Sequence, residues 1–438
     1  MKKLFSLLLV LCLALSLLPA SALAADVIAS GVGLDGLQWS YTRDGVLTVS
    51  GRGPMRSYHK SDITMDSNID QRVPAPWVRY ASEIQSVVIG EGVTEVGDYT
   101  FIDCRALKRV QLPSTLRRVG GYAFSDASLE SLQLPDGLQR IGSYAFAENN
   151  FQTVILPASV TELGDHAFYA CKQLNVVWIL GPVSSVDVGT FGSCYGITDV
   201  FLSGGIGSVH RNGFTGTQIV DVYYGGSRDS FYAMTGNVYG DLTDNTNRFH
   251  FNFKLNPYVS FEDVAAGKWY SSSVLWAAQR GITTGTAAGR FEPTAVCTRA
   301  QMVTFLWRAM GSAEPFFPNE NPFTDVRPTD YYYKAVLWAR ERSIAKGTSE
   351  TTFSPDSTVT RAETVTFLSR AADDLPTIPT ISYTDVPRDA YYYEAVRWAE
   401  NDGVTTGVAP GVFGPNLPCS RAEIVTFLNR AKMVLTAK

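Results

Sequence analysis

Two internal repeats of different period occupy most of this 438-residue chain. Six consecutive units of 22 to 23 residues run from residue 84 to about residue 218. A longer pattern then begins at residue 261 and occurs three times, with offsets of 62 and 60 residues. A short unit cannot bury its apolar side chains alone, so neighbouring units must stack and share a continuous core. We therefore expect a multidomain chain with two repeat architectures in series.

The short unit predicts a β-rich solenoid. The copy LESLQLPDGLQRIGSYAFAENN, which starts at residue 129, has an alternating apolar run, a proline, a second apolar pair and an aromatic element that ends in Phe146. Alternation indicates a strand with one face turned inward. The phenylalanine recurs in every unit, so these rings are expected to form the core: Phe101, Phe124, Phe146, Phe168, Phe191 and Phe214.

One column of strand residues is expected to face outward, because it lies between two inward-facing apolar positions. Along the array it changes from polar to apolar, through Val88, Gln111, Gln133, Ile155, Trp178, Phe201 and Tyr223. An open face of this kind is a candidate contact surface, which assigns its last four residues to ligand binding. The alternative is that residues 231–253 fold back as a cap and cover the stripe.

The pattern LP.gl.rIGsyAF resembles the BspA-like leucine-rich repeats of bacterial surface proteins. The preceding GLQWSYTRDGVLTVSGRGPMRSY resembles the segment that caps such arrays. The resemblance implies a β-rich cap over residues 25–83 and repeats with a C-terminal cap over residues 84–253. It further implies a secreted or wall-attached protein that binds other surfaces, with an unknown protein or glycan ligand and no catalysis.

The long repeat keeps every spacing from its aspartate onward. The first copy has Asp263, Trp276, Gly285, Phe291 and Arg299, and equivalent residues recur in both later copies. The patterns F.DV, Y..AV.WA, GIT.G and TRAE resemble the S-layer homology (SLH) domain, over residues 258–312, 320–374 and 380–433. This resemblance implies an all-α pseudo-threefold trimer with grooves between its copies.

The same resemblance implies attachment to secondary cell-wall polysaccharide, typically a pyruvylated glycan. Its groove residues carry over to three sets of this sequence: Arg299, Arg361 and Arg421; Trp276, Trp338 and Trp398; and Gly285, Gly347 and Gly407. The second copy departs from the pattern. It has Ser343, Lys346 and Thr351 where the other copies have Gly281 and Gly403, Thr284 and Thr406, and Gly289 and Gly411.

The arginine of each TRAE-like segment stands at an electrostatically unfavourable place. Thr298-x-x-Gln301 has the spacing of a capping box, as do the TRAE and SRAE segments of the later copies, so Arg299 is the first helical residue. A cation there opposes the helix macrodipole. With free backbone N–H groups, the guanidinium suits a carboxylate such as the pyruvate ketal. Alternatively, each arginine forms a salt bridge with an aspartate of a neighbouring copy, drawn from Asp263, Asp325 and Asp385. The tryptophans are as compatible with core packing as with stacking on a sugar.

The first 24 residues, MKKLFSLLLVLCLALSLLPASALA, have the basic start, apolar run and small-residue end of a secretory signal cleaved before Ala25. The protein is therefore expected to be exported. The remaining sequence has no stretch long and apolar enough to span a membrane. Five of the six cysteines remain after cleavage. Small buried side chains are favoured over bridges or metal ligands, although a Cys171–Cys194 bridge stays open.

Composition argues against other classes of function. The formal charge of −5 is not accompanied by a polybasic stripe, which excludes the usual signature of a nucleic-acid binder. The four histidines lack metal-ligand spacing, and no catalytic motif occurs. We expect no cofactor, no metal and no enzymatic activity. The sequence predicts a wall-anchored protein that displays a solenoid for adhesion or recognition. The alternative is a structural spacer of the envelope without a specific ligand.

Overall fold

The computed structural model describes residues 26–58, 74–236, 240–244, 247–265, 268–372 and 381–435. The predicted signal segment, residues 1–24, lies outside these residues. The chain divides into two compact units, Met1–Leu255 and Asn256–Lys438. Each is described by itself below.

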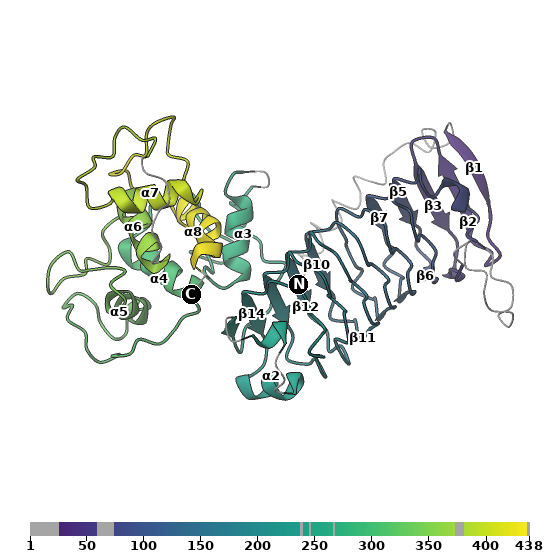
Figure 1. The fold of residues 1–438 in the computed structure, drawn as a ribbon, viewed down its shortest axis with the longest axis horizontal. Coiled ribbons are helices and arrows are strands. Elements are labelled where there is room, and N and C mark those ends of the chain that lie inside the picture. The colour runs from purple at the N-terminus through teal and green to yellow at the C-terminus, as the bar shows by residue number, and fades with distance from the viewer. Residues whose placement is uncertain are drawn as a thin grey trace. The chain divides into compact units, whose positions relative to one another are not determined.

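The first unit is a solenoid of parallel strands (Figure 1). Its sheet β10-β12-β13-β14-β15 is built from Thr153–Leu156, Val176–Ile179, Asp199–Leu202, Asp221–Tyr224 and Arg248–His250. The register pairs Val154 with Val177, Val177 with Val200, and Val200 with Val222. Equivalent positions of successive units are therefore neighbours, as the sequence period predicts.

Two further sheets complete this unit. One has the order β1-β2-β3-β5-β7 and the other β11-β9-β8-β6-β4. Strands β1 to β3 pair in antiparallel fashion, and β3 then joins β5 in parallel, so residues 27–50 cover the first repeat. The bounds are Val27–Val32, Gln38–Thr42, Val46–Ser50, Ser86–Ile89 and Arg109–Gln111 for the first sheet, and Glu162–Leu163, Arg140–Ile141, Arg118–Val119, Val93–Val96 and Gly53–Pro54 for the second.

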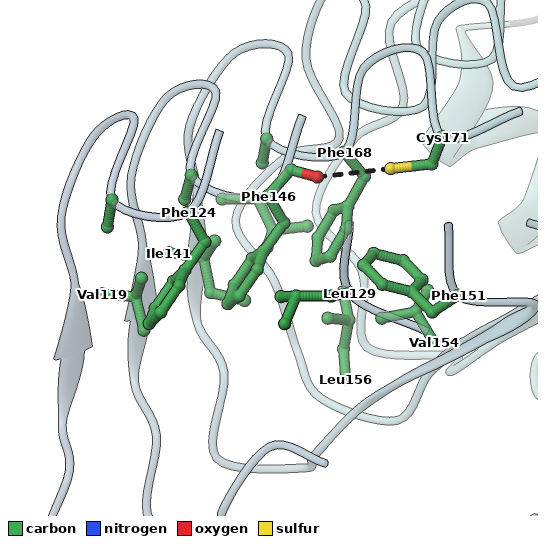
Figure 2. Close-up of a cluster of buried hydrophobic side chains, with 14 of the residues drawn as sticks. Val119, Phe124, Leu129, Ile141, Phe146, Phe151, Val154, Leu156, Phe168 and Cys171 are labelled. Carbon is green, nitrogen blue, oxygen red and sulfur yellow. Dashed lines mark hydrogen bonds between the residues drawn. The ribbon is translucent and has the colours of Figure 1, made fainter. Parts of the chain in front are cut away.

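The core of the solenoid is a row of stacked phenylalanines. Phe124, Phe146 and Phe168 lie 5.5 Å apart between ring centroids, with nearly parallel planes. Figure 2 shows these rings in a row, with Phe151 beside Phe168. All six predicted core phenylalanines are buried. The prediction of a shared core is thus confirmed.

The cysteines of the described residues are free and buried. The Cys171 Sγ donates to the carbonyl oxygen of Phe146 at 3.3 Å (Figure 2). Cys194 Sγ makes the equivalent bond to Phe168 at 3.1 Å. The two thiols that the sequence left open for a bridge are therefore unbridged and serve as small core groups.

Helix α2, Arg228–Thr235, and the 3-10 turn η2, Asp241–Thr243, precede the last strand of the solenoid. Helix α2 begins after Ser227, which accepts a hydrogen bond from the N–H of Ser230, and ends at Gly236 in the left-handed conformation. Strand β15 is joined to strand β14 by charged side chains as well as by backbone pairing. Arg248 donates to both oxygens of the buried Asp221 carboxylate, and His250 contacts the same group at 2.9 Å.

The second unit is helical, with two helices in each copy of the long repeat. The bounds are α3 Ser271–Gln279 and α4 Arg299–Ala309, α5 Tyr333–Glu341 and α6 Arg361–Ala372, and α7 Tyr393–Asn401 and α8 Arg421–Leu435. Helix α4 begins with a complete capping box between Thr298 and Gln301. The predicted helix start is therefore confirmed.

The three copies meet through a closed cycle of backbone hydrogen bonds. Cys297 donates to Cys419, Cys419 donates to Val359, and Val359 donates to Cys297, each at 2.9 to 3.0 Å. Helices α4, α6 and α8, which follow these residues, contact one another pairwise. The three helix starts therefore lie together at the centre of the unit.

Candidate functional site

The helix starts of the second unit are closed by neighbouring copies. The backbone N–H groups of Arg299 and Ala300 donate to the carbonyl oxygens of Ser357 and Pro355 in the next copy. The starts of α6 and α8 are bonded in the same way. The sequence-based expectation of free N–H groups beside each arginine is wrong, because these donors are used to join the copies.

The arginine side chains also reach into the next copy, and all three are buried. Arg361 donates from Nε to the carbonyl oxygen of Phe413, from Nη1 to Glu423 at 2.7 Å, and from Nη2 to Thr405 at 3.2 Å. Its guanidinium also lies over the rings of Phe413 and Phe427. This arginine has a partner at each nitrogen.

Arg299 is bound in the same manner. It contacts the carbonyl oxygen of Phe353, the carboxylate of Glu363 and the carbonyl oxygen of Lys346. Salt bridges between copies were one of the two predicted roles, but the predicted partner was wrong. The acid is the capping-box glutamate of the next helix, whose other oxygen accepts from the N-cap backbone.

The aspartates of the long repeat serve their own copies instead. Asp263 accepts hydrogen bonds from the backbone of Phe291 at 2.9 Å and Glu292 at 2.7 Å. Asp325 and Asp385 do the same in the later copies. Burial opposes ionisation of Asp263, but the backbone donors outweigh it and hold the pKa of this carboxyl below its ordinary value. These carboxylates stabilise the conformation of the loop that carries Phe291 and its equivalents.

Arg421 differs from the other two arginines. Its Nε donates to the carbonyl oxygen of Phe291 at 2.8 Å, but its Nη2 is buried without a hydrogen-bond partner in the described structure. The residue is only 4% exposed. Burial lowers the pKa of Arg421 from its ordinary value, since no carboxylate of the described residues is close enough to pair with it.

A groove of about 360 Å³ opens at Arg421. Its walls are the loop 283–286 and helix α4 of the first copy, with Tyr331 contributed by the second copy and Arg421 by the third. A second groove, of about 460 Å³, lies at Arg361 of the second copy. Its walls are the equivalent loop 405–408 and helix α8 of the third copy, with Trp269 contributed by the first copy. Each groove therefore draws side chains from all three copies.

Sequence reasoning missed several residues of these grooves. Trp269 and Tyr331 occupy equivalent positions of different copies and are 59% and 60% exposed. Arg308 and Arg430, which helix electrostatics alone would explain, line one groove each. Their positions relative to Trp276 and Arg299 recur in every copy, so the repeat alignment held a signal for them.

Two of the three predicted groove tryptophans are core residues. Trp338 and Trp398 are 2% and 0% exposed, and only Trp276 is half-buried. Arg280 and Arg342 lie over Trp276 and Trp338 respectively. Stacking of Trp338 or Trp398 on a sugar is therefore contradicted, because helix packing covers their rings.

The predicted glycines lie where the backbone is crowded. Gly285 and Gly407 line the two grooves and adopt left-handed φ angles of 86° and 77°. A Cβ on Gly347 would lie 2.3 Å from the carbonyl oxygen of Ser349, so this position excludes a side chain by contact. In the second copy, Ser343 adopts φ 56° at the position of Gly281 and Gly403.

The outward column of the solenoid is not an open face at its C-terminal end. Trp178, Phe201 and Tyr223 stack on one another and are 1%, 0% and 3% exposed. Phe253 and Leu255 pack against them, while Ile155 is half-buried at the edge of this cluster. The predicted contact surface is therefore wrong for the three aromatic residues. The alternative of a covering tail is the one observed: His250 and Phe253 lie within residues 231–253, and Leu255 adds a contact just beyond that range.

Neither a metal centre nor a membrane segment is recognisable in the described part of the chain. These residues contain no group of three or more histidine, cysteine, aspartate or glutamate side chains placed to hold a metal ion. Their helices include none with the length and hydropathy of a membrane span.

Two family descriptions match this chain. "BspA type Leucine rich repeat region" matches in six copies over residues 78–198 and 118–234. "S-layer homology domain" matches at residues 260–303, 322–365 and 382–425.

Curated relatives resemble part of the chain. The middle cell wall protein of Brevibacillus brevis is 32% identical over 156 residues, which are 35% of this chain and 14% of the relative. The S-layer protein EA1 of Bacillus anthracis is 25% identical over 172 residues, 39% of this chain and 20% of the relative. An endoglucanase of Bacillus sp. (strain KSM-635) is 29% identical over 130 residues, 30% of this chain and 14% of the enzyme. The chain spans 7 to 16% of the length of the first three relatives.

Solved structures also resemble part of the chain. A leucine-rich repeat protein of Bacteroides ovatus has a TM-score of 0.32 and 20% identity, over 44% of this chain and 58% of the other. The chain contains a BspA-type leucine-rich repeat region followed by three S-layer homology domains, and it is an exported protein of the cell surface.

Proposed function

We propose that the three SLH domains hold this protein non-covalently on secondary cell-wall polysaccharide, with a pyruvylated glycan as the ligand. The observation that carries the proposal is the pair of grooves at Arg361 and Arg421. Each combines a buried arginine, a second arginine, threonine hydroxyls and an exposed aromatic ring. Hydroxyl groups and a ring face suit a sugar, and a guanidinium suits a carboxylate.

The proposal includes a pseudo-threefold arrangement of the SLH copies. It is supported by the cycle of hydrogen bonds through Cys297, Val359 and Cys419, in which each copy donates to one neighbour and accepts from the other. The grooves follow the same order. Each takes its arginine from the preceding copy and its ring from the following one.

Sedimentation with purified native walls tests the anchor. The chain expressed from residue 25 is expected to sediment with native walls and to be lost from walls whose pyruvate has been removed. The triple variant Arg299→Ala, Arg361→Ala and Arg421→Ala tests the arginines together. Arg105→Ala is a matched control, because this arginine is exposed on the solenoid. Wall binding that survives depyruvylation would argue against the carboxylate, and failure of the parent chain to sediment would argue against the anchor itself.

We propose that the solenoid is displayed for adhesion or recognition and that the protein is not an enzyme. The face that remains open carries polar side chains such as Arg109, Gln111 and Gln133, which are exposed. The covered aromatic stripe favours the second candidate, an envelope spacer, because it removes the apolar feature that suggested a ligand. Wall-bound protein is then tested against immobilised matrix proteins and glycan arrays. A recognition protein retains a ligand that Gln111→Ala with Gln133→Ala weakens, whereas a spacer retains none.

A further inference from the structure

The three buried arginines of the SLH unit differ in how many of their donors the protein uses. Arg299 and Arg361 each donate from Nε, Nη1 and Nη2 to neighbouring copies. Arg421 donates only from Nε, and its Nη2 has no partner among the described residues. A buried charged donor without a partner loses the hydration that it had in water, which makes this state costly unless a ligand supplies an acceptor.

A single residue explains why Arg421 forms no ion pair. The glutamates that pair with Arg299 and Arg361 are Glu363 and Glu423, and the equivalent residue facing Arg421 is Gln301. Gln301 uses its Oε1 to accept the N-cap backbone N–H of Thr298. The other end of this side chain is then an amide N–H₂, which can only donate. Two donors cannot satisfy each other, so Arg421 lacks the ion pair that Arg299 and Arg361 make from Nη1.

The charges that line the two grooves differ accordingly. Arg308 and Arg421 line the first groove, and no carboxylate does. The other groove is lined by Arg361 and Arg430 together with Glu423. Asp263 acts on Arg421 only from a distance, because its own oxygens accept from the backbone of Phe291 and Glu292. The exposed Glu292 forms no ion pair with Arg421 within 4 Å among the described residues.

We propose that the groove at Arg421 is the one that binds the negatively charged group of the wall polymer, that Gln301 makes it selective for an anion, and that the groove at Arg361 takes uncharged sugar. This inference rests on the proposed attachment to wall polysaccharide. A carboxylate in the first groove accepts from the Gln301 amide and from Arg421 Nη1, the nitrogen that in Arg361 pairs with Glu423. The ring of Tyr331 lies at the same groove. In the other groove, Glu423 already forms an ion pair with Arg361, and its negative charge repels an anion.

Isothermal titration with a matched pair of probes tests this proposal. The probes are a methyl hexoside with a 4,6-O-(1-carboxyethylidene) group and the methyl ester of the same compound, which has no charge. The full chain from residue 25 is expected to bind the acid about ten-fold more tightly than the ester, at one site. Gln301→Glu is expected to abolish this preference, because the introduced carboxylate would pair with Arg421 as the glutamates of the other copies pair with their arginines.

The matched variant is Glu423→Gln, which would free Arg361 and give a second acid-selective site, so the stoichiometry is expected to rise towards two. It also guards against misfolding, because a gain of binding cannot result from loss of structure. Equal binding of acid and ester by the parent chain, or an acid preference that persists in Gln301→Glu, would overturn the proposal. If walls still retain the parent chain in that case, the anchor stands and only the assignment of the charged groove fails. A parent chain that walls do not retain overturns the anchor.

Discussion

A buried guanidinium needs acceptors for its N–H groups, and Arg361 and Arg421 meet this need to different extents. Arg361 bonds to a carbonyl oxygen, a carboxylate and a hydroxyl, whereas Arg421 bonds to one carbonyl oxygen. Since unpaired burial of a charge is unfavourable, the two residues contribute very differently to stability although their surroundings are repeats of each other.

We predict that Arg361→Met lowers the free energy of unfolding of the SLH unit by about 3 kcal/mol, because it leaves Glu423 without its partner. Arg421→Met should change it by less than about 1 kcal/mol, since the lost hydrogen bond is offset by removal of an unpaired buried charge. Urea unfolding followed by circular dichroism at the helix band measures both. Equal losses would show that Arg421 has an internal partner after all.

A second residue-scale prediction compares two glycines of the third copy. Both Gly407 and Gly403 have positive φ, but a Cβ on Gly407 would lie 2.5 Å from the carbonyl oxygen of Val412, whereas nothing lies within 4 Å of one on Gly403. Gly403→Ala should therefore cost only the backbone strain, about 1 kcal/mol. Gly407→Ala should cost clearly more and also weaken wall binding, because the loop that lines the groove must move. Thermal unfolding of the two variants side by side tests this order.

At the scale of elements, the repeat period predicted the strand register and the phenylalanine row, because stacking of equal units admits one arrangement of their core positions. The capping boxes could also be predicted from the sequence, since they involve residues three apart on one helix. The partner of each arginine could not be predicted. The Glu363 carboxylate lies 64 residues from Arg299 along the chain, and spacing within a repeat carries no information on which acid of the next copy it meets. The covering of Trp178 depended on a tail without any repeat pattern.

The phenylalanine row gives a prediction for the solenoid. Phe146 is fully buried and stacks on both of its neighbours. Phe146→Ala should lower the free energy of unfolding of the solenoid by about 3 to 5 kcal/mol, because it leaves a cavity in a core that is continuous on both sides. The exposed Gln133 of the same repeat is the control, and its replacement by alanine should be neutral within about 0.5 kcal/mol. Chemical unfolding measures the free energy of unfolding of both variants, and equal losses would contradict the prediction.

The loop held by Asp263 makes the SLH unit sensitive to acid. The folded pKa of this carboxyl lies below its unfolded value, so its contribution to stability is complete above about pH 4 and is lost as the pH falls through the folded pKa. Asp263→Asn should therefore destabilise the unit at pH 6, and the difference from the parent should shrink below pH 4. Urea unfolding at pH 6 and pH 3 measures this change. Asp136→Asn, which removes a carboxylate at an exposed site of the solenoid, is the control for the substitution itself.

At the scale of the whole molecule, each of the two compact units has its own large core, and the described cysteines lie inside these cores. The five described thiols are at most 1% exposed. Burial raises the pKa of Cys104, Cys297 and Cys419 to about 12, and a thiol that does not ionise reacts slowly. The folded chain from residue 25 should therefore resist a thiol reagent until urea is added, and a reductant should leave its melting temperature unchanged. Rapid labelling of the folded chain would contradict the burial of these thiols.

The cycle through Cys297, Val359 and Cys419 also sets an order of events. Export delivers a chain from its N-terminus, and the cycle lacks one of its three members until residue 419 has crossed the membrane. The first groove is likewise incomplete until Arg421 is present, since this residue bonds to Phe291, 130 positions earlier. A product cut short before the third SLH copy therefore carries a finished solenoid but no closed anchor. If the SLH unit anchors the protein as proposed, such a product is expected to be released into the medium, and retention on the wall would then select chains that are complete to the third copy.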